Sequence, residues 1–320
     1  MSRTPRALRM ALLLCCAMTL SHAPAASAAD PAAASLPDVT VIAPRPPTPQ
    51  ELAGEAVPHF VESHATASTV LHQLTRWRTG VCPSTRGLDP GMNAFVSARI
   101  RAVAAAVGAP HQDAPECTPN VEILFTLEPQ QVLDEVAKHD SRLLGFHYSQ
   151  QQKKLATFTH PIQGWYVTST RNFKGQEAID EASPLGASQS DIGTPTGNLP
   201  SSRVPPGEPG SRLTNLRSSQ VVLALIVVDA NKITGMSIGA LSDYLAMLAL
   251  SQAKPSETCS QLPTIMDLMA AACEAGEKPD QITAGDLAFL HALYGANLET
   301  PIELEQSNIE NAMMLQFHKR

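Results

Sequence analysis

Residues 221–229 have the sequence Val-Val-Leu-Ala-Leu-Ile-Val-Val-Asp, in which eight apolar residues precede one acid. A continuous apolar run of this length, rich in β-branched side chains, is typical of a strand that is covered on both faces of a sheet. Residues 237–251 follow, with large apolar side chains at helical spacing: Ile238, Leu241, Leu245 and Leu248. We therefore expect an interior strand followed by a core helix, with the Ser237 side chain as its N-cap.

The segments around this pair supply its packing partners. Upstream, the patterns predict one helix and three strands in chain order, at 91–107, 121–127, 155–160 and 165–170, with a further helix at 130–138. Other helices or helical turns are expected at 50–63, 68–78, 264–272, 283–294 and from there to residue 320. The pattern indicates an α+β fold in which the helices at 91–107 and 237–251 pack on a small mixed sheet containing 121–127 and 221–229.

The composition predicts one folded domain with irregular attachments. The chain has 320 residues, of which 43% are hydrophobic and 26 are prolines. That hydrophobic fraction is enough for a core, and the prolines favour long irregular segments. We expect the domain at 51–310, between a disordered Ala/Pro-rich tail at 29–50 and a C-terminal tail at 311–320. The Pro/Gly/Ser-rich segment at 184–212 is predicted to be a mobile loop of the domain rather than a linker between domains.

Residues 1–28 have the layout of a secretory signal peptide. Three arginines stand at the beginning, an apolar stretch covers 10–20, and small residues occupy 26–28. The apolar stretch is shorter than the ~20 residues that a helix needs to span a bilayer. We expect cleavage after Ala28 and export to the periplasm or the medium, with no transmembrane segment in the mature chain.

Removal of the leader changes the charge balance. It removes three of the 23 basic residues and none of the 30 acidic ones, so the mature chain has 20 basic residues and a net charge of −10. This charge favours solubility and disfavours binding to nucleic acid or to anionic membranes. The sequence names no partner; the candidates are an envelope protein or a peptide.

Four cysteines remain in the mature chain, and an even number in an exported protein predicts disulfides. Three pairings are possible. We favour Cys82–Cys117 and Cys259–Cys273, because these pairs lie within local regions and close the shorter loops. Four zinc-binding thiolates are the alternative, but no Cys-x-x-Cys spacing is present.

The helix at 237–251 resembles the active-site helix of the metzincin zinc peptidases, which contains His-Glu-x-x-His-x-x-Gly-x-x-His. In this overlay Asp243 takes the position of the glutamate, and Ala249 takes that of the glycine. The three histidine positions are taken by Ser242, Ala246 and Gln252.

Two downstream segments extend the resemblance. Residues 263–267, with Met266, are similar to the methionine turn that lies beneath the metal, and residues 283–295 resemble the closing helix of the matrix-type metzincins. The resemblance implies a zincin-like fold, with residues 221–229 as an edge strand beside the substrate cleft. The whole chain also resembles a family of uncharacterised exported proteobacterial proteins, which implies no function.

The residues at the overlaid positions predict that the metal is absent. A catalytic zinc needs three protein ligands, two of them histidines at i and i+4 of one helix. Ser242 and Ala246 offer a hydroxyl and a methyl group, and Gln252 offers a neutral amide, so we expect no cofactor. Asp243 would then be a general base without a metal-bound water to activate. Its alternative interpretation is a solvated position on an amphipathic helix, and that of Met266 is an ordinary core methionine.

A rival interpretation uses the Gly-x-Ser-x-Gly pattern at 235–239, which is typical of the nucleophile elbow of α/β-hydrolases. Ser237 would be the nucleophile, and its partners would come from the acids Asp267 or Asp286 and the bases His291 or His318. However, an elbow turns directly off a strand, whereas residues 230–234 intervene here. No His-Gly-Gly element for an oxyanion hole precedes it, and no further strand is predicted after it.

Three hypotheses follow for the function. The favoured one is an exported pseudo-enzyme with a binding or assembly role in the cell envelope. The alternative is a secreted serine hydrolase that uses Ser237. A metallopeptidase with ligands from elsewhere in the chain is the third hypothesis.

Overall fold

The structure is a computed structural model, and it describes residues 56–68, 70–112, 117–145, 151–172, 174–180, 217–255, 257–297 and 300–318. The predicted leader, the tail at 29–50 and the loop at 184–212 lie outside these residues. The described residues belong to one compact unit. Among them, no helix combines the length and the apolar character that a membrane span requires.

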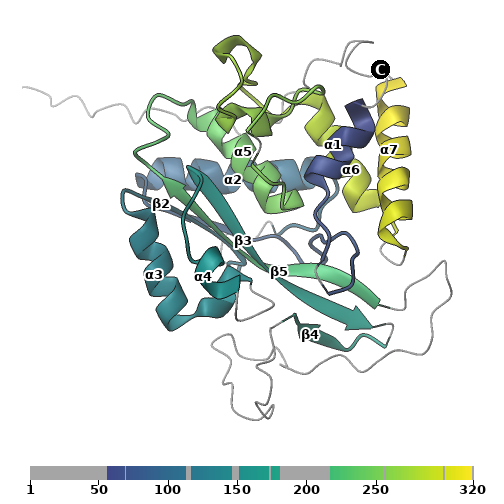
Figure 1. The fold of residues 1–320 in the computed structure, drawn as a ribbon, viewed down its shortest axis with the longest axis horizontal. Coiled ribbons are helices and arrows are strands. Elements are labelled where there is room, and N and C mark those ends of the chain that lie inside the picture. The colour runs from purple at the N-terminus through teal and green to yellow at the C-terminus, as the bar shows by residue number, and fades with distance from the viewer. Residues whose placement is uncertain are drawn as a thin grey trace, which may run out of the picture. The chain divides into compact units, whose positions relative to one another are not determined.

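Five strands form one mixed sheet, in the order β1-β2-β5-β3-β4 (Figure 1). Their bounds are Pro83–Arg86 (β1), Val121–Thr126 (β2), Ile162–Asn172 (β3), Glu177–Ile179 (β4) and Arg217–Asp229 (β5). Strands β1, β2 and β5 are parallel, whereas β3 runs antiparallel to both β5 and β4. The fold is therefore a mixed α+β fold, as the sequence predicts.

Strand β5 is the centre of this sheet. It pairs with β2 on one side, where Val121 lies opposite Ala224, and with β3 on the other. Its apolar side chains alternate between two cores, because Ile226 belongs to the large core on one face and Val227 to a smaller core on the other. The prediction of an interior strand is confirmed. The edge position that the metzincin resemblance implies is wrong, since both edges of β5 are hydrogen-bonded.

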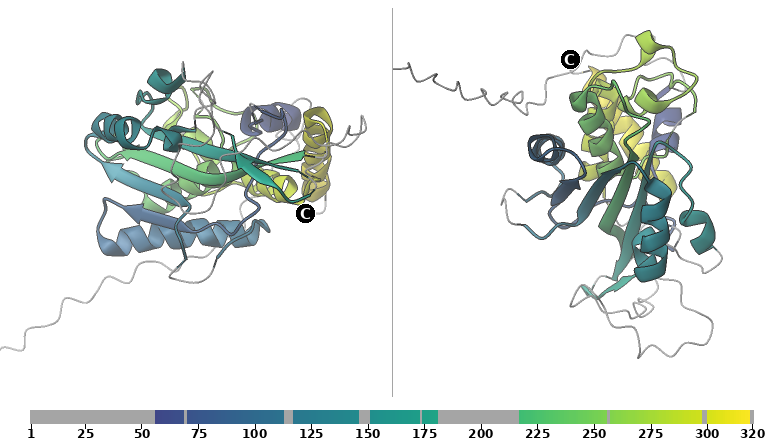
Figure 2. Two further views of the ribbon diagram at one scale, coloured as in Figure 1. Left: turned by 90° about the horizontal axis from the view of Figure 1, so that it is seen from below. Right: turned by 90° about the vertical axis from the view of Figure 1, so that its left-hand side faces the viewer.

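Helices cover both faces of the sheet (Figure 2). The large core contains side chains of five helices: α1 (Ala56–His64), α2 (Pro90–Ala106), α5 (Ile238–Ser251), α6 (Ala284–Gly295) and α7 (Ile302–His318). On the opposite face, α3 (Pro129–His139), the 3₁₀ helix η1 (Ser141–Leu144) and α4 (Gln152–Leu155) enclose the smaller core around Leu133 and Trp165. Helices α2 and α5 pack against each other on the sheet, as predicted from their apolar stripes.

Two predicted elements are wrong. Residues 68–78 are not a helix: Ser68 Oγ accepts hydrogen bonds from Val70 N and Leu71 N, which turns the chain, and the backbone of Trp77 forms a bridge with β5. Residues 155–160 are not a strand, because α4 ends at Leu155 and the following residues pack against the smaller core. In both segments tertiary contacts outweigh a local apolar pattern.

The C-terminal boundary also differs from the prediction. Helix α7 continues to His318, so residues 311–318 are not a tail. Met313 and Phe317 are buried in the large core, and α7 packs against α1 and α6. Strands β1 and β4 were not predicted. They have four and three residues, which is too short for an alternation of apolar and polar side chains to be recognised.

Both predicted disulfides are present. Cys82–Cys117 joins the residue before β1 to the segment that leads into β2. Cys259–Cys273 closes a loop between α5 and α6. Cys82–Cys117 therefore reinforces the pairing of β1 with β2 beside it, and Cys259–Cys273 holds a connection that contains no strand or α-helix.

Replacing Cys82 and Cys117 together by serine should lower the free energy of unfolding by about 3–4 kcal/mol, because the disulfide restricts a 35-residue loop in the unfolded chain. Denaturant unfolding of the oxidised proteins measures this. Peptide mapping under non-reducing conditions is the control. Recovery of peptides linked through any other cysteine pair would contradict the assignment.

Candidate functional site

The positions that match the zinc ligands are packed inside the protein. Ser242 and Ala246 are fully buried, and Ser242 Oγ donates a hydrogen bond to Ile238 O at 2.6 Å. Gln252 ends α5 in the left-handed conformation, and its side-chain amide donates to the Thr75 hydroxyl. Within the described residues, no group of three or more His, Cys, Asp or Glu side chains is placed to hold a metal ion.

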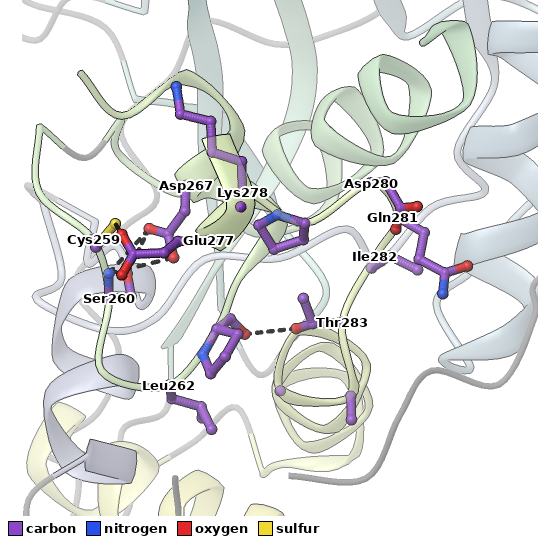
Figure 3. A pocket seen from close by; sticks show the side chains of 15 residues that line it. Cys259, Ser260, Leu262, Asp267, Glu277, Lys278, Asp280, Gln281, Ile282 and Thr283 are labelled. Carbon is purple, nitrogen blue, oxygen red and sulfur yellow. Dashed lines mark hydrogen bonds between the residues drawn. The ribbon is translucent and has the colours of Figure 1, made fainter. Parts of the chain in front are cut away.

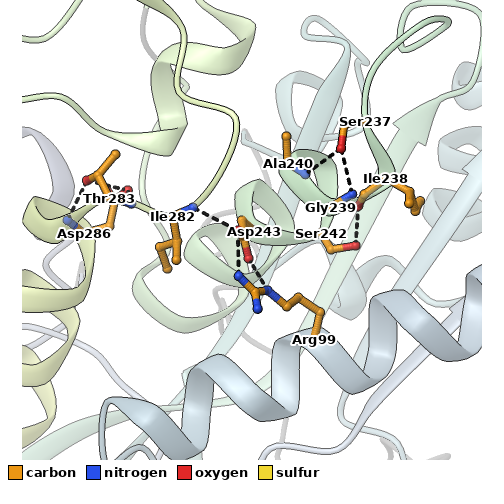
Figure 4. Close-up of polar contacts among 10 residues, drawn as sticks. All are labelled: Arg99, Ser237, Ile238, Gly239, Ala240, Ser242, Asp243, Ile282, Thr283 and Asp286. Atoms are coloured by element: carbon orange, nitrogen blue, oxygen red, sulfur yellow. Dashed lines mark hydrogen bonds and ion pairs between the residues drawn. The ribbon is translucent and has the colours of Figure 1, made fainter. Parts of the chain in front are cut away.

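Asp243 is buried, which corrects the interpretation that it is solvated. Its carboxylate accepts hydrogen bonds from Arg99 Nε at 2.6 Å and from Arg99 Nη2 at 3.0 Å. It also accepts a hydrogen bond from Ile282 N at 2.9 Å (Figure 4). The side chains of Arg99 and Asp243 are 8% and 1% exposed. Asp243 thus joins α2, α5 and the residues before α6, and both of its oxygens are occupied by these contacts.

Ser237 has the predicted capping role. Its Oγ accepts hydrogen bonds from Gly239 N at 3.2 Å and Ala240 N at 3.5 Å, as an N-cap does. Residues 230–236 separate it from the end of β5, so the turn is not the tight strand-to-helix elbow of a hydrolase.

The acids and bases considered for Ser237 do not gather around it. Asp286 lies on the far side of Asp243 from Ser237 in Figure 4, at the start of α6. Asp267 accepts hydrogen bonds from the backbone and hydroxyl of Ser260. His291 is exposed on α6, and the His318 side chain lies outside the described part of the chain. Residues proposed for one triad are therefore distributed over separate places.

The structure instead forms a hollow of about 470 Å³ in the connection between α5 and α6. We call it the 259–285 pocket. It lies beside the 3₁₀ helices η3 (Ile265–Met269) and η4 (Ala275–Glu277). The side chains that matter for its chemistry are Ser260, Asp267, Glu277, Lys278, Asp280, Gln281 and Thr283 (Figure 3).

The walls of this pocket are fixed at several points. The Cys259–Cys273 disulfide ties one side, and the Thr283 hydroxyl donates to Pro263 O at 2.8 Å on another. Glu274 and Glu277 form a capping box around η4. The Ile282 backbone is held by Asp243, so the buried ion pair also positions a residue of the pocket wall.

The charge of the pocket is negative. Three carboxylates, those of Asp267, Glu277 and Asp280, and one ammonium group, that of Lys278, line it. Asp267 and Glu277 lie together on one side, and Asp280 lies on the other (Figure 3). Burial raises the pKa of the Asp267 carboxyl, the hydrogen bonds from Ser260 oppose this rise, and the charge of Glu277 adds to it.

Met266 lies in the large core. It is fully buried in η3, which packs against α5, and the Thr264 hydroxyl caps the first turn of η3 by accepting Met266 N at 3.2 Å. Both interpretations of Met266, a core methionine and a methionine turn, require a buried position. The predicted helical turn at 264–272 is present as η3.

A buried polar chain supports the same region. The Thr264 hydroxyl donates to Asp286 Oδ1 at 2.5 Å and lies 3.4 Å from His64 Nε2, which joins α1 to the start of α6. Burial lowers the pKa of His64 to about 4, and the hydrogen-bonding contact with Phe60 O opposes this change. Burial raises the pKa of Asp286 to about 6, although Thr264, Ile265 and Thr283 donate hydrogen bonds to its carboxylate.

The sequence analysis missed Arg99, His64 and Thr264. Arg99 had a detectable signal, because it stands between Phe95 and Val103 in the apolar pattern of α2, where a lone cation needs a buried partner. His64 and Thr264 had none, since their contact joins residues 200 positions apart.

Substitution of Asp243 by alanine should lower the free energy of unfolding by about 3–5 kcal/mol, because Arg99 is then a buried charge without its carboxylate. The double variant Arg99→Met with Asp243→Leu should recover most of this loss, since it removes both charges and fills the space. Denaturant unfolding measures both effects, with Asp280→Asn as a control at the pocket wall. A double variant as unstable as Asp243→Ala would contradict the ion-pair explanation.

The stability of the protein should respond to His64 between pH 6.5 and 4. The pKa of His64 is lowered in the folded state, so the stability that its neutral form contributes is present above pH 6.5 and is lost as pH falls towards 4. Asp286, with its raised pKa, acts in the opposite direction, because its contribution is lost as pH rises through 6.

The variant His64→Gln isolates the histidine contribution. As pH falls from 6.5 to 4, the natural chain should lose on the order of 3 kcal/mol of unfolding free energy that His64→Gln does not lose, so the variant becomes more stable relative to the natural chain by that amount. Thermal or denaturant unfolding at several pH values measures the difference. The matched control is His59→Gln, an exposed histidine of the same helix. Parallel pH curves for His64→Gln and the natural chain would refute the assignment.

Comparison of the chain with protein-family models, with curated proteins and with solved structures finds no match. The metzincin resemblance therefore stays a resemblance of residue patterns, and the functional hypotheses stay predictions.

Proposed function

We propose that this protein is an exported, non-catalytic binding protein, and that its 259–285 pocket binds a cationic group of an envelope protein or peptide. The observation that supports this best is the lining of the pocket, which contains three carboxylates and one ammonium group and so has a net negative charge. A hollow whose walls have one sign of charge attracts ligands of the opposite sign.

The fixed walls support a binding role. Recognition is tighter when the site does not have to become ordered as the ligand enters. Here a disulfide, two capping boxes and the hydrogen bond from Ile282 N to Asp243 hold the pocket. The two disulfides are also compatible with an oxidising compartment, which supports export to the periplasm or the medium.

The proposal includes a degenerate zincin-like arrangement. In its favour, the helix with Ser242 and Ala246 is followed by a buried turn that contains Met266 and then by α6, as in the resembled peptidases. The central position of β5 departs from that family. A non-catalytic role is supported by the buried hydroxyl and methyl group at two of the positions where a peptidase has histidines.

Binding of a cation can be tested with a pair of ligands that differ only in charge. N-acetyl-arginine amide should bind saturably to the full mature chain in isothermal titration calorimetry, whereas the neutral isostere N-acetyl-citrulline amide should not. The double variant Glu277→Gln with Asp280→Asn should weaken the binding by about tenfold, because it removes two exposed charges. Glu128→Gln is the control, an exposed acid outside the pocket.

Four outcomes would overturn the proposal. Two are the absence of binding by the cationic amide and equal binding of the neutral isostere. The third is covalent labelling of Ser237 by a fluorophosphonate probe, which would support the hydrolase hypothesis. The fourth is stoichiometric zinc in protein purified without added metal, which would support the metallopeptidase hypothesis.

A further inference from the structure

A second hollow lies near the amino-terminal ends of the parallel strands. Its volume is about 430 Å³, and we call it the arginine hollow. Its lining comes from the segment before β1, the residues after α2 and the end of α6, and comprises Arg76, Trp77, Arg78, Gly108, Pro110, Tyr294, Ala296 and Asn297. It shares no residue with the 259–285 pocket.

Two arginines line this hollow. Arg76 is 4% exposed and donates hydrogen bonds to the carbonyl groups of Leu293 and Ala296. Arg78 is exposed and donates to the Ser218 hydroxyl at 2.8 Å. A guanidinium group has five N–H donors, so both arginines retain donors beyond these contacts.

The two arginines carry two positive charges, and one carboxylate, that of Glu305, acts on Arg76. Burial lowers the pKa of Arg76 to about 10, the charge of Glu305 opposes this change, and the charge of Arg78 adds a smaller lowering. Glu305 is the carboxylate that stabilises the Arg76 cation, and its Oε2 also accepts Leu74 N at 2.8 Å. Two cations and one carboxylate leave a net charge of about +1.

The neighbouring helix ends do not cancel this charge. The carbonyl groups at the end of a helix present partial negative charge unless they are bonded. At the end of α2, Gly108 N donates to Ala105 O at 3.2 Å and Ala109 N donates to Ala104 O at 2.9 Å. At the end of α6, Arg76 itself occupies two carbonyl groups.

The remaining wall contains Asn297 and three side chains with rings, those of Trp77, Pro110 and Tyr294. The Trp77 indole N–H donates to Ala249 O at 2.7 Å, and the Tyr294 hydroxyl donates to Leu250 O at 2.8 Å. Both polar atoms are therefore satisfied within the protein. Trp77 is 1% exposed and lies behind the surface, whereas Tyr294 and Pro110 are partly exposed and offer ring surface rather than hydrogen bonds.

We propose that the arginine hollow binds a small organic carboxylate, whose negative group lies at Arg76 and Arg78 and whose apolar part contacts Tyr294 and Pro110, in front of the buried Trp77. Guanidinium groups bind carboxylates through paired N–H···O bonds, and a net charge of about +1 matches a monoanion rather than a dianion. This site is independent of the proposed function of the 259–285 pocket, and either can fail without the other.

The two tryptophans of the chain, Trp77 and Trp165, provide an internal comparison, because Trp165 lies in the smaller core on the other face of the sheet. In ¹⁵N–¹H spectra of the full mature chain, N-acetylphenylalanine should shift the indole signal of Trp77 saturably and leave that of Trp165 in place. The variant Trp165→Phe assigns the two signals. N-acetylphenylalanine amide, at the same ionic strength, should shift neither.

Variants then locate the carboxylate. Arg78→Ala should weaken the binding by about tenfold or more, as expected for the loss of a charge-assisted hydrogen bond, and Arg78→Lys should retain part of it. Arg78 is exposed, so these variants are expected to fold. Arg86→Ala is the matched control, since its side chain is 70% exposed and faces Glu122 on β2 rather than the hollow.

Several results would overturn the proposal. They are no saturable shift of Trp77, an equal shift with the neutral amide, and unchanged affinity in Arg78→Ala. Inorganic phosphate is the remaining arm of the experiment. If phosphate shifts Trp77 and N-acetylphenylalanine does not, the hollow binds an inorganic dianion and the assignment to an organic carboxylate is wrong.

Discussion

The ion pair between Arg99 and Asp243 is the constraint on which the arrangement of the core helices depends. Removing two charges from water is costly unless they are paired and their remaining hydrogen-bonding capacity is used. Helix α5 is buried along almost its whole length, so its apolar side chains alone specify no unique orientation. Asp243 must meet both Arg99 and Ile282 N, and this fixes how α5 faces α2 and where the residues before α6 pass.

That constraint connects the core with the surface. Ile282 is held by Asp243 and also lines the 259–285 pocket, so a buried charge on α5 positions part of a hollow that opens in the following connection. The disulfide Cys259–Cys273 and the contact between Thr264 and Asp286 hold the other parts of the same connection. A segment without long helices or strands thereby acquires walls that are fixed enough for recognition.

The helix with Ser242, Asp243 and Ala246 has a different role in the structure from the one that its sequence pattern implies. A comparison of sequence patterns aligns these residues with a catalytic helix, whereas the packing makes the helix part of the core. Its one carboxylate is used to hold three segments together, and the serine hydroxyl bonds the preceding turn of its own helix. Ser237 was correctly predicted as a helix cap, because a capping serine acts within four residues and needs no tertiary partner.

The sequence by itself determined the elements whose signals are local: the interior strand β5, the helices α2, α5 and α6, the α+β class and the pairing of neighbouring cysteines. Only the tertiary structure decided which strands pair with β5, the irregular path of residues 68–78, the inclusion of residues 311–318 in the core and the two hollows. Those features join residues far apart in the chain, as Arg76 and Leu293 or Arg99 and Asp243 do. Apolar periodicity predicts that a side chain is buried, but the residues that cover this side chain depend on how the whole chain packs.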